Sequence, residues 1–268
     1  MDASQYKDYI LTMLFVKYVS DKYYGQKDSI IEVPEGGSFN DMVKLKGKPN
    51  IGEGINTIVA KLAEENELKG IIDVADFDDT DKLGSGQGKT DMLSNIVGIF
   101  QRESLDFSKN KAEGDDILGD AYEYLIAQFA SGAGKKAGEF YTPQEVSMIL
   151  AKLVTDGKEK LKSVYDPPCG SGSLLLRVAK EVKDVSSFYG QELNRTTYNL
   201  ARMNMIMHDV HYNRFDLKQE DTLEAPQHEG QTFEAIVANP PFSAKWSSNP
   251  LHLSDERFSE YGRLAPKS

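Results

Sequence analysis

The sequence predicts a mixed α/β chain, in which a helical amino-terminal domain precedes an incomplete, doubly wound parallel sheet. Three observations predict this class. Apolar residues recur at helical spacing through the first 130 residues, a glycine-rich joint follows at residues 131–138, and short apolar runs then alternate with helical patterns. Such alternation of strand, turn and helix is typical of parallel sheets. We therefore expect two domains, at residues 1–130 and 131–268.

The amino-terminal domain is expected to consist of helices joined by polar loops. Ser4 offers an N-cap to the first helix. The helical patterns cover residues 6–18, 58–68, 92–107 and 117–129. A polar loop at residues 76–88 leads into Lys89 and Thr90 and so resembles a phosphate-binding loop. That motif requires a glycine where Leu83 stands, and no buried strand precedes it, so we predict no ATP site here.

The second domain is expected to alternate strands with helices. Strand patterns lie at residues 163–165, 186–190, 214–217 and 233–238, and helical patterns at residues 174–182 and 195–207. The pattern over residues 233–238 is the strongest of the strands, and the one over residues 214–217 is the weakest. The residues after position 242 are polar and poor in strand signals. We therefore expect a C-terminally truncated sheet with an exposed edge.

Composition and charge restrict the class of function. The net charge is −11, from 31 basic and 42 acidic side chains, which argues against a protein that grips DNA unaided. Cys169 is the single cysteine, so no internal disulfide forms. No apolar run approaches the roughly 18 residues of a membrane span, and no secretory signal is present. His208 and His211 lack a third ligand nearby, so no metal site is predicted. We expect a cytoplasmic protein.

A glycine turn after the first strand of the second domain is the candidate cofactor site. In doubly wound folds, ligands bind outside the carboxyl ends of the strands. Asp166 precedes Gly170 and Gly172 in this turn, and an acid there suits a ligand with an amino group better than a pyrophosphate. Glu192, after the second strand, can accept from both hydroxyls of a ribose, and Asp221, after the third, from an adenine amine. The alternative is an ordinary strand–helix turn.

A proline-stiffened loop after the strongest strand is the candidate target site. Its sequence is Asn239-Pro240-Pro241-Phe242. The prolines fix the backbone, so that the amide oxygen of Asn239 and the carbonyl of Pro240 can face one point. Two adjacent acceptors suit a planar amino group with two N–H donors, and Phe242 can stack on the ring that carries it. The alternative is a loop in which Phe242 only packs.

The glycine turn and the Asn-Pro-Pro-Phe loop together resemble the amino-methyltransferases. With the segment Gly-Glu-Phe-Tyr-Thr-Pro at residues 138–143, the chain is identified as a member of the modification subunits of type I restriction-modification systems. The resemblance implies a Rossmann-like methyltransferase sheet, S-adenosyl-L-methionine as cofactor and adenine N6 in DNA as target. It also implies three partners: a specificity subunit that reads DNA, a second modification subunit and a restriction subunit.

The resemblance also assigns roles to individual residues. The residues implied to bind cofactor are Phe140, Tyr141 and Thr142 near its methionine part, Asp166, Gly170 and Gly172 in the turn, Glu192 at the ribose and Asp221 at the adenine. The residues implied to hold the target adenine are Asn239, Pro240 and Phe242.

Two other functions stay open at this point. A protein glutamine side chain presents the same planar amine, so a glutamine N-methyltransferase is one alternative. The other is a non-catalytic fragment that binds cofactor or a partner without transferring methyl, because few residues follow the target loop to wall its pocket.

Overall fold

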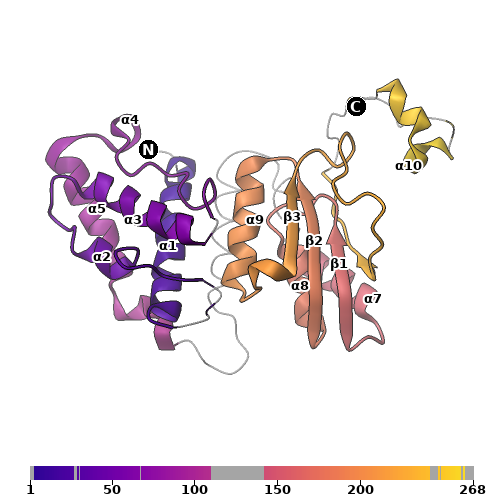
Figure 1. Cartoon of the computed structure of the whole chain (residues 1–268), viewed down its shortest axis with the longest axis horizontal. Coiled ribbons are helices and arrows are strands. Elements are labelled where there is room, and N and C mark those ends of the chain that lie inside the picture. Colours follow the sequence, from indigo (N-terminus) through magenta and orange to yellow (C-terminus); the bar gives the residue numbers. More distant parts are fainter. Residues whose placement is uncertain are drawn as a thin grey trace.

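The computed structural model describes residues 3–26, 29, 31–66, 68–109, 142–241, 247, 249–260 and 262. A group of helices lies beside a parallel sheet with its own helices (Figure 1). This arrangement confirms the predicted fold class. The predicted helix at residues 117–129 and the expected domain boundary near residue 130 lie outside the described residues. No helix in the described ranges is long and apolar enough to cross a membrane.

The amino-terminal part is helical, as predicted, with some boundaries shifted. In chain order its helices are α1 (Ala3–Tyr23), α2 (Phe39–Val43), α3 (Ile51–Glu65), α4 (Thr80–Leu83) and α5 (Gly86–Phe100), followed by 3-10 turns at Glu103–Leu105 and Phe107–Lys109. The predicted cap at Ser4 is wrong, because α1 has already begun at Ala3. Helix α5 stops short of the predicted residue 107, since the chain tightens into the 3-10 turns.

Helix α3 begins at Ile51, seven residues before the predicted start at residue 58, and its first turn contains Gly52 and Gly54. Neither glycine has room for a side chain. A Cβ on Gly52 would lie 2.4 Å from the carbonyl oxygen of Phe77, and one on Gly54 would lie 2.6 Å from Leu45 Cδ1. The glycines therefore serve close packing, which overrides their low helix propensity.

The segment that resembles a phosphate-binding loop has a structural role. Helix α5 begins at Gly86, and Lys89 lies in its first turns with its side chain buried. The Lys89 ammonium pairs with the half-exposed carboxylate of Asp78. A lysine whose ammonium is already paired with a carboxylate serves here as a structural contact between α5 and the preceding loop.

The sheet is parallel, with strand order β3-β2-β1-β4. Its strands are β1 (Lys160–Asp166), β2 (Asp184–Glu192), β3 (Phe215–Gln219) and β4 (Ala235–Ile236). The strand predicted to be strongest is thus the shortest. Among the described residues it pairs only with β1, and its exposed Ile236 lies at the edge of the sheet. The apolar residues of this segment indicate that it is buried, but the length of a strand depends on how many of its residues pair with a neighbouring strand.

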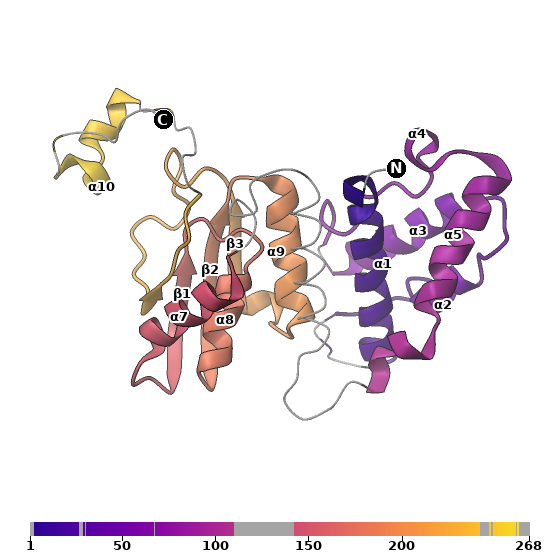
Figure 2. The same ribbon diagram turned by 180° about the vertical axis from the view of Figure 1, so that it is seen from behind.

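Three helices cover one face of the sheet. They are α7 (Gln144–Thr155), which the sequence analysis missed, α8 (Ser173–Glu181) and α9 (Arg195–Met207). Figure 2 shows α7 and α8 in front of the strands. They pack over a core that contains Val164 and Phe188. On the opposite face, Tyr165 and Tyr189 pack against Phe233, with ring centroids 4.5 and 5.1 Å apart.

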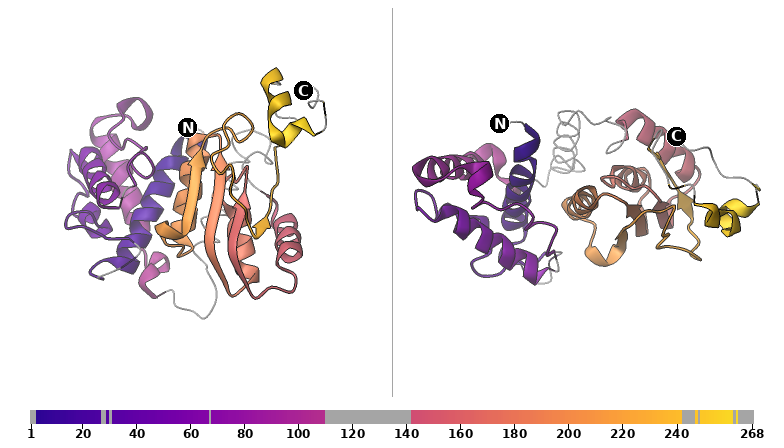
Figure 3. Two further views of the ribbon diagram at one scale, coloured as in Figure 1. Left: turned by 45° about the vertical axis from the view of Figure 1, so that its right-hand side comes forward. Right: turned by 90° about the horizontal axis from the view of Figure 1, so that it is seen from above.

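Helix α9 belongs to two hydrophobic cores. Met203 and Met207 pack with the amino-terminal helices, whereas Ala201 and Met205 pack with the sheet. Figures 1 and 3 show α9 between α1 and the strands. Asp209, in a left-handed conformation (φ 60°) just after this helix, fastens it to α1. Its carboxylate accepts from Tyr23 Oη at 2.7 Å and Lys22 Nζ at 2.5 Å.

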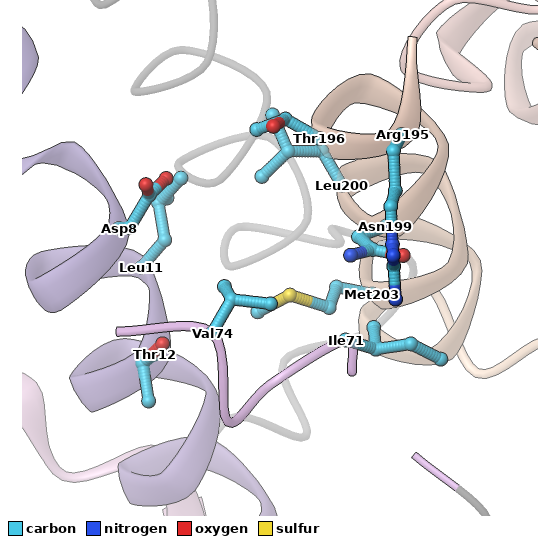
Figure 4. Close-up of a pocket in the computed structure, with 10 residues that line it drawn as sticks. All are labelled: Asp8, Leu11, Thr12, Ile71, Val74, Arg195, Thr196, Asn199, Leu200 and Met203. Carbon is cyan, nitrogen blue, oxygen red and sulfur yellow. The ribbon is translucent and has the colours of Figure 1, made fainter. Parts of the chain in front are cut away.

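A cleft of about 130 Å³ lies where α1 meets α9. Figure 4 shows Leu11 and Thr12 of α1 on one side and Asn199 and Met203 of α9 on the other. The side chain of Asn199 donates to the carbonyl oxygen of Gly70 at 2.6 Å, which ties α9 to the amino-terminal part a third time. None of the predicted site residues lines this cleft, so it is not the predicted site.

Replacing Met205 with alanine tests whether α9 couples the two cores. Met205 is fully buried, and we expect the free energy of unfolding to fall by about 2–5 kcal/mol. Because α9 is shared, hydrogen exchange should accelerate in α3 as well as in β1. Exchange measured by mass spectrometry in low urea would show this, with the exposed Ile99 changed to alanine as the control. Loss of protection in β1 alone would contradict the coupling.

Candidate active site

The predicted site residues follow the carboxyl ends of four adjacent strands. Asp221 follows β3, Glu192 ends β2, Asp166 ends β1, and Asn239 follows β4. All four strands are parallel, so their carboxyl ends share one edge of the sheet. The glycine turn and the Asn-Pro-Pro loop leave β1 and β4, which are hydrogen-bonded neighbours. The strand order thus meets the geometric condition for donor and acceptor sites to face each other.

The turn after β1 is built on left-handed glycines. Gly170 has φ 55° and Gly172 has φ 76°, a region that side chains disfavour. Gly172 is the N-cap of α8, and its amide donates to the Cys169 carbonyl at 2.8 Å. The Cys169 amide donates in turn to the carbonyl of Gln191 at 2.9 Å, which holds the turn against β2. The glycines leave the backbone bare beside the strand ends.

Two carboxylates lie together at this turn. Asp166 is 2% exposed, and its Oδ1 has no hydrogen-bond partner among the described residues. Glu192 accepts from the Gly170 amide at 3.1 Å and from the Asn194 amide at 2.7 Å. Burial, and then the neighbouring Glu192, raise the pKa of Asp166 well above its usual range, and burial raises the pKa of Glu192. A buried acid with an unused oxygen beside a half-buried acid suits a cationic ligand.

Cys169 lies in the turn but shows no sign of reactivity. Its side chain is buried, and burial raises the pKa of its thiol well above the usual range. A thiol with a raised pKa is a poor nucleophile. Its sulfur and Cβ leave no space for a side chain at Gly190, where an added Cβ would lie 2.9 Å from Cys169 Cβ. Cys169 therefore packs β1 against β2.

The loop after β3 is tied to the glycine turn by residues that the sequence analysis did not single out. Thr222 Oγ1 donates to the Pro167 carbonyl at 2.6 Å. The buried Gln191 side chain donates to the carbonyls of Glu220 and Ala225 at 3.1 and 3.0 Å. No sequence motif marks these residues, because each acts across strands that are distant in the chain. Asp221 Oδ1 accepts from the Leu223 amide at 2.8 Å, which orients its carboxylate.

Thr142 orients the asparagine of the target loop. Asn239 Nδ2 donates to Thr142 Oγ1 at 3.3 Å. The amide nitrogen is thereby directed to Thr142, and the amide oxygen is turned to the other side. Thr142 thus lies against the target loop, a contact that its motif did not indicate. Phe140, Tyr141 and Phe242 lie outside the described residues.

No group of three or more potential metal ligands occurs among the residues that the structure describes. The groups at the strand-end edge are carboxylates, amides and backbone groups. Acceptors predominate: the buried Asp166 and the half-buried Glu192 at the turn, one acid after β3 and one amide after β4. Such a set fits a ligand with amino and hydroxyl donors at the turn, and an amine at the target loop.

Comparison with known proteins gives matches over the entire chain. Residues 113–268 match the family model "N-6 DNA Methylase", and residues 1–100 match the "HsdM N-terminal domain". The chain is 33% identical to the type I restriction enzyme MpnII methylase subunit of Mycoplasma pneumoniae, over 100% of this chain and 60% of that protein. It is 28% identical to the HindI methylase subunit of Haemophilus influenzae, over 86% of this chain and 50% of that one.

A solved structure shows the same architecture. The methyltransferase subunit of a type I restriction-modification system from Streptococcus thermophilus superposes with a TM-score of 0.80 at 33% identity. The match covers 100% of this chain and 65% of that one. The chain therefore spans about half to two thirds of the length of these relatives.

Proposed function

The chain belongs to the N-6 DNA methylase family, among the methylase subunits of type I restriction enzymes, and from this premise we propose its reaction. In the proposed reaction, a methyl group passes from S-adenosyl-L-methionine to adenine N6 in DNA. The observation that carries the proposal is the pairing of β1 with β4. It brings the turn at Gly170 and the loop at Asn239 to neighbouring strand ends, where a donor and an amine can meet.

The residues at the turn fit the proposed cofactor. Asp166, with its unused buried oxygen, would accept from the amino group of the methionine part. The carboxylate of Glu192 would accept from the ribose hydroxyls, and that of Asp221 from the adenine amine. Gly170 and Gly172 allow the backbone to approach closely. When bound, the cofactor supplies a methyl group activated by a sulfonium. We place Phe140 and Tyr141 beside its methionine part, as the resemblance implies.

The target loop would act on the adenine amine by accepting its two hydrogens. Asn239 Oδ1 accepts one N–H, and the Pro240 carbonyl accepts the other. An amine with both hydrogens held out of the ring plane regains lone-pair density for attack on the methyl carbon. A hydrogen bond that strengthens as charge develops typically stabilises the transition state by about 3 kcal/mol in enzyme sites. The new carbon–nitrogen bond would form as the carbon–sulfur bond breaks and releases S-adenosyl-L-homocysteine, and the proton of the methylated amine would then pass to solvent water. Phe242 would stack on the flipped adenine.

The acidic charge of the chain supports a complex in which another subunit binds the DNA. A net charge of −11 opposes unaided binding to phosphates, so we propose that a specificity subunit holds the DNA. A second modification subunit and a restriction subunit complete the proposed complex. We propose that the complex is cytoplasmic and methylates cellular DNA there. The family match favours DNA over the protein glutamine considered from the sequence.

The proposal is tested by incubating the chain with labelled S-adenosyl-L-methionine, alone and with a specificity subunit. Plasmid DNA and a glutamine-containing peptide serve as competing acceptors. We expect label in adenine N6 of the DNA when the specificity subunit is present. Label in the peptide instead, or none in DNA with a complete complex that binds the cofactor, would overturn the proposal.

Replacing Thr142 with valine tests how Asn239 is oriented. Valine keeps the branched shape and removes the hydroxyl that accepts from Asn239 Nδ2. We expect the rate of methyl transfer to fall about tenfold, since one hydrogen bond is lost near the reacting amine. Thr142→Ser, which keeps the hydroxyl, should restore the rate. Single-turnover rates and calorimetric cofactor affinities separate the effects: a change in affinity alone would place Thr142 at the cofactor instead.

A further inference from the structure

A short segment after the target loop contacts the loop that bears Asp221. This segment contains the 3-10 helix η5 (Pro250–Ser254) and α10 (Glu256–Ser259), and Figure 3 shows it, in yellow, outside the layers of sheet and helices. We propose that Arg257 in this segment is a positioning residue for the adenine end of the cofactor site. This role rests on the proposed function, which assigns the cofactor adenine to Asp221.

The guanidinium of Arg257 holds two consecutive backbone carbonyls. Its Nη1 donates to the carbonyl of Thr222 and its Nη2 to that of Leu223, each at 2.8 Å. Asp255 fixes the guanidinium from the other side, accepting from Nη2 at 2.6 Å and from Nε at 3.0 Å. A planar fork of donors makes these contacts together, whereas the point charge of a lysine does not. Hydrogen bonds from Arg257 lower the pKa of Asp255 to about 2, so the pair is charged at neutral pH.

These contacts determine the position of the Asp221 carboxylate. The Leu223 amide donates to Asp221 Oδ1, and the peptide groups on either side of Leu223 are those whose carbonyls Arg257 holds. The hydroxyl of Thr222 is tied to Pro167 in the glycine turn. Thr222 is thus fixed through its side chain at the cofactor turn and through its carbonyl at Arg257. With both ties present, the Leu223 amide that holds Asp221 Oδ1 keeps its position relative to the glycine turn.

A second contact of the same segment supports this role. The hydroxyl of Ser247 donates to the Glu224 carboxylate, and His252 Nε2 lies 3.2 Å from the same oxygen. The segment therefore grips the loop at three successive residues, 222 to 224. Because this stretch follows the target loop in the chain, it connects the target side of the site to the adenine side.

The test compares Arg257→Ala and Arg257→Lys with the unsubstituted chain. The probes are S-adenosyl-L-homocysteine and its inosine counterpart, which lacks the amine that Asp221 would accept from. Isothermal titration calorimetry gives both affinities. We expect the unsubstituted chain to prefer the adenosine form, and both variants to bind it about tenfold more weakly and to lose most of that preference. Arg102→Ala, an exposed arginine in the amino-terminal part, is the matched control and should leave both affinities unchanged.

The outcomes separate this role from the proposed function. An unaltered preference in both Arg257 variants overturns the positioning role while the proposed function stands. If the unsubstituted chain binds neither probe, the proposed function fails and this role fails with it. If Arg257 only stabilised the fold, its variants would bind both probes more weakly by the same factor. The ratio of the two affinities would then be unchanged, which would count against a positioning role. Thermal melting identifies any variant that does not fold, and the lysine variant then carries the test.

Discussion

Asn239→Ala is expected to reduce methyl transfer to DNA at least about 10²–10³-fold while cofactor affinity stays within about twofold. The reason lies in the order of the strands. Asn239 follows β4, whereas the acids and glycines assigned to the cofactor follow β1, β2 and β3. The substitution therefore removes one acceptor of the target amine and leaves the cofactor turn unchanged. Calorimetry measures the cofactor affinity. Single-turnover experiments on the complex with a specificity subunit measure the rate of methyl transfer.

An aspartate at the same position is the matched comparison. Asn239→Asp keeps an acceptor oxygen but cannot donate to Thr142, whose hydroxyl must then donate to the carboxylate. We expect its rate to fall between those of the unsubstituted protein and the alanine variant. Turnover by Asn239→Ala at the unsubstituted rate would remove Asn239 from the reacting centre. A large loss of cofactor affinity in that variant would place it at the donor side.

Asp166→Asn is expected to have opposite effects on stability and on ligand binding. Asp166 is buried at 2% exposure beside Glu192, with Oδ1 lacking a partner among the described residues. Removing an uncompensated buried charge should stabilise the ligand-free chain at neutral pH by about 1–3 kcal/mol. Cofactor affinity should fall about a hundredfold, because the amino group loses its charged acceptor. Urea unfolding without ligand and calorimetry with S-adenosyl-L-methionine measure the two effects.

Glu192→Gln provides the contrast. Both carboxylate oxygens of Glu192 accept backbone hydrogen bonds, from Gly170 and from Asn194. A glutamine would turn an NH₂ group toward one of these amides, so this substitution should destabilise the ligand-free chain. Removing the negative charge is thus expected to stabilise the ligand-free chain at Asp166 and to destabilise it at Glu192. Destabilisation by Asp166→Asn would contradict the view that its charge is uncompensated.

The same acids predict how stability depends on pH. Asp166 and Glu192 have pKa values raised above their usual 3.8 and 4.5. An acid whose pKa is higher in the folded chain holds its proton more tightly there, so its contribution to stability is full below the unfolded pKa. That contribution is lost as the pH rises from about 4 toward the folded pKa. Asp166→Asn should flatten this decline, and cofactor affinity should rise over the same window as the acids ionise.

Local patterns in the sequence were sufficient for most helices and for the turns of the site. The helix at 195–207 is predicted to the residue. The left-handed turn at Gly170 and Gly172 follows from glycines that tolerate positive φ. The predicted length of the strand at residues 233–238 was wrong. Among the described residues this strand, β4, pairs only with β1 and covers two residues. Helix α7 was missed, although its apolar residues at positions 146, 149, 150, 153 and 154 recur at helical spacing.

The sequence alone determined the kinds of group at the site and their order along the chain: an acid with glycines, two further acids and an asparagine before two prolines. These are local properties, set by residue identity and backbone preference. Only the tertiary structure decided that β4 lies beside β1, that Thr142 directs the amide of Asn239, and that Arg257 holds the loop of Asp221. Each of these depends on contacts between residues far apart in the chain, and such contacts leave no periodicity in the sequence.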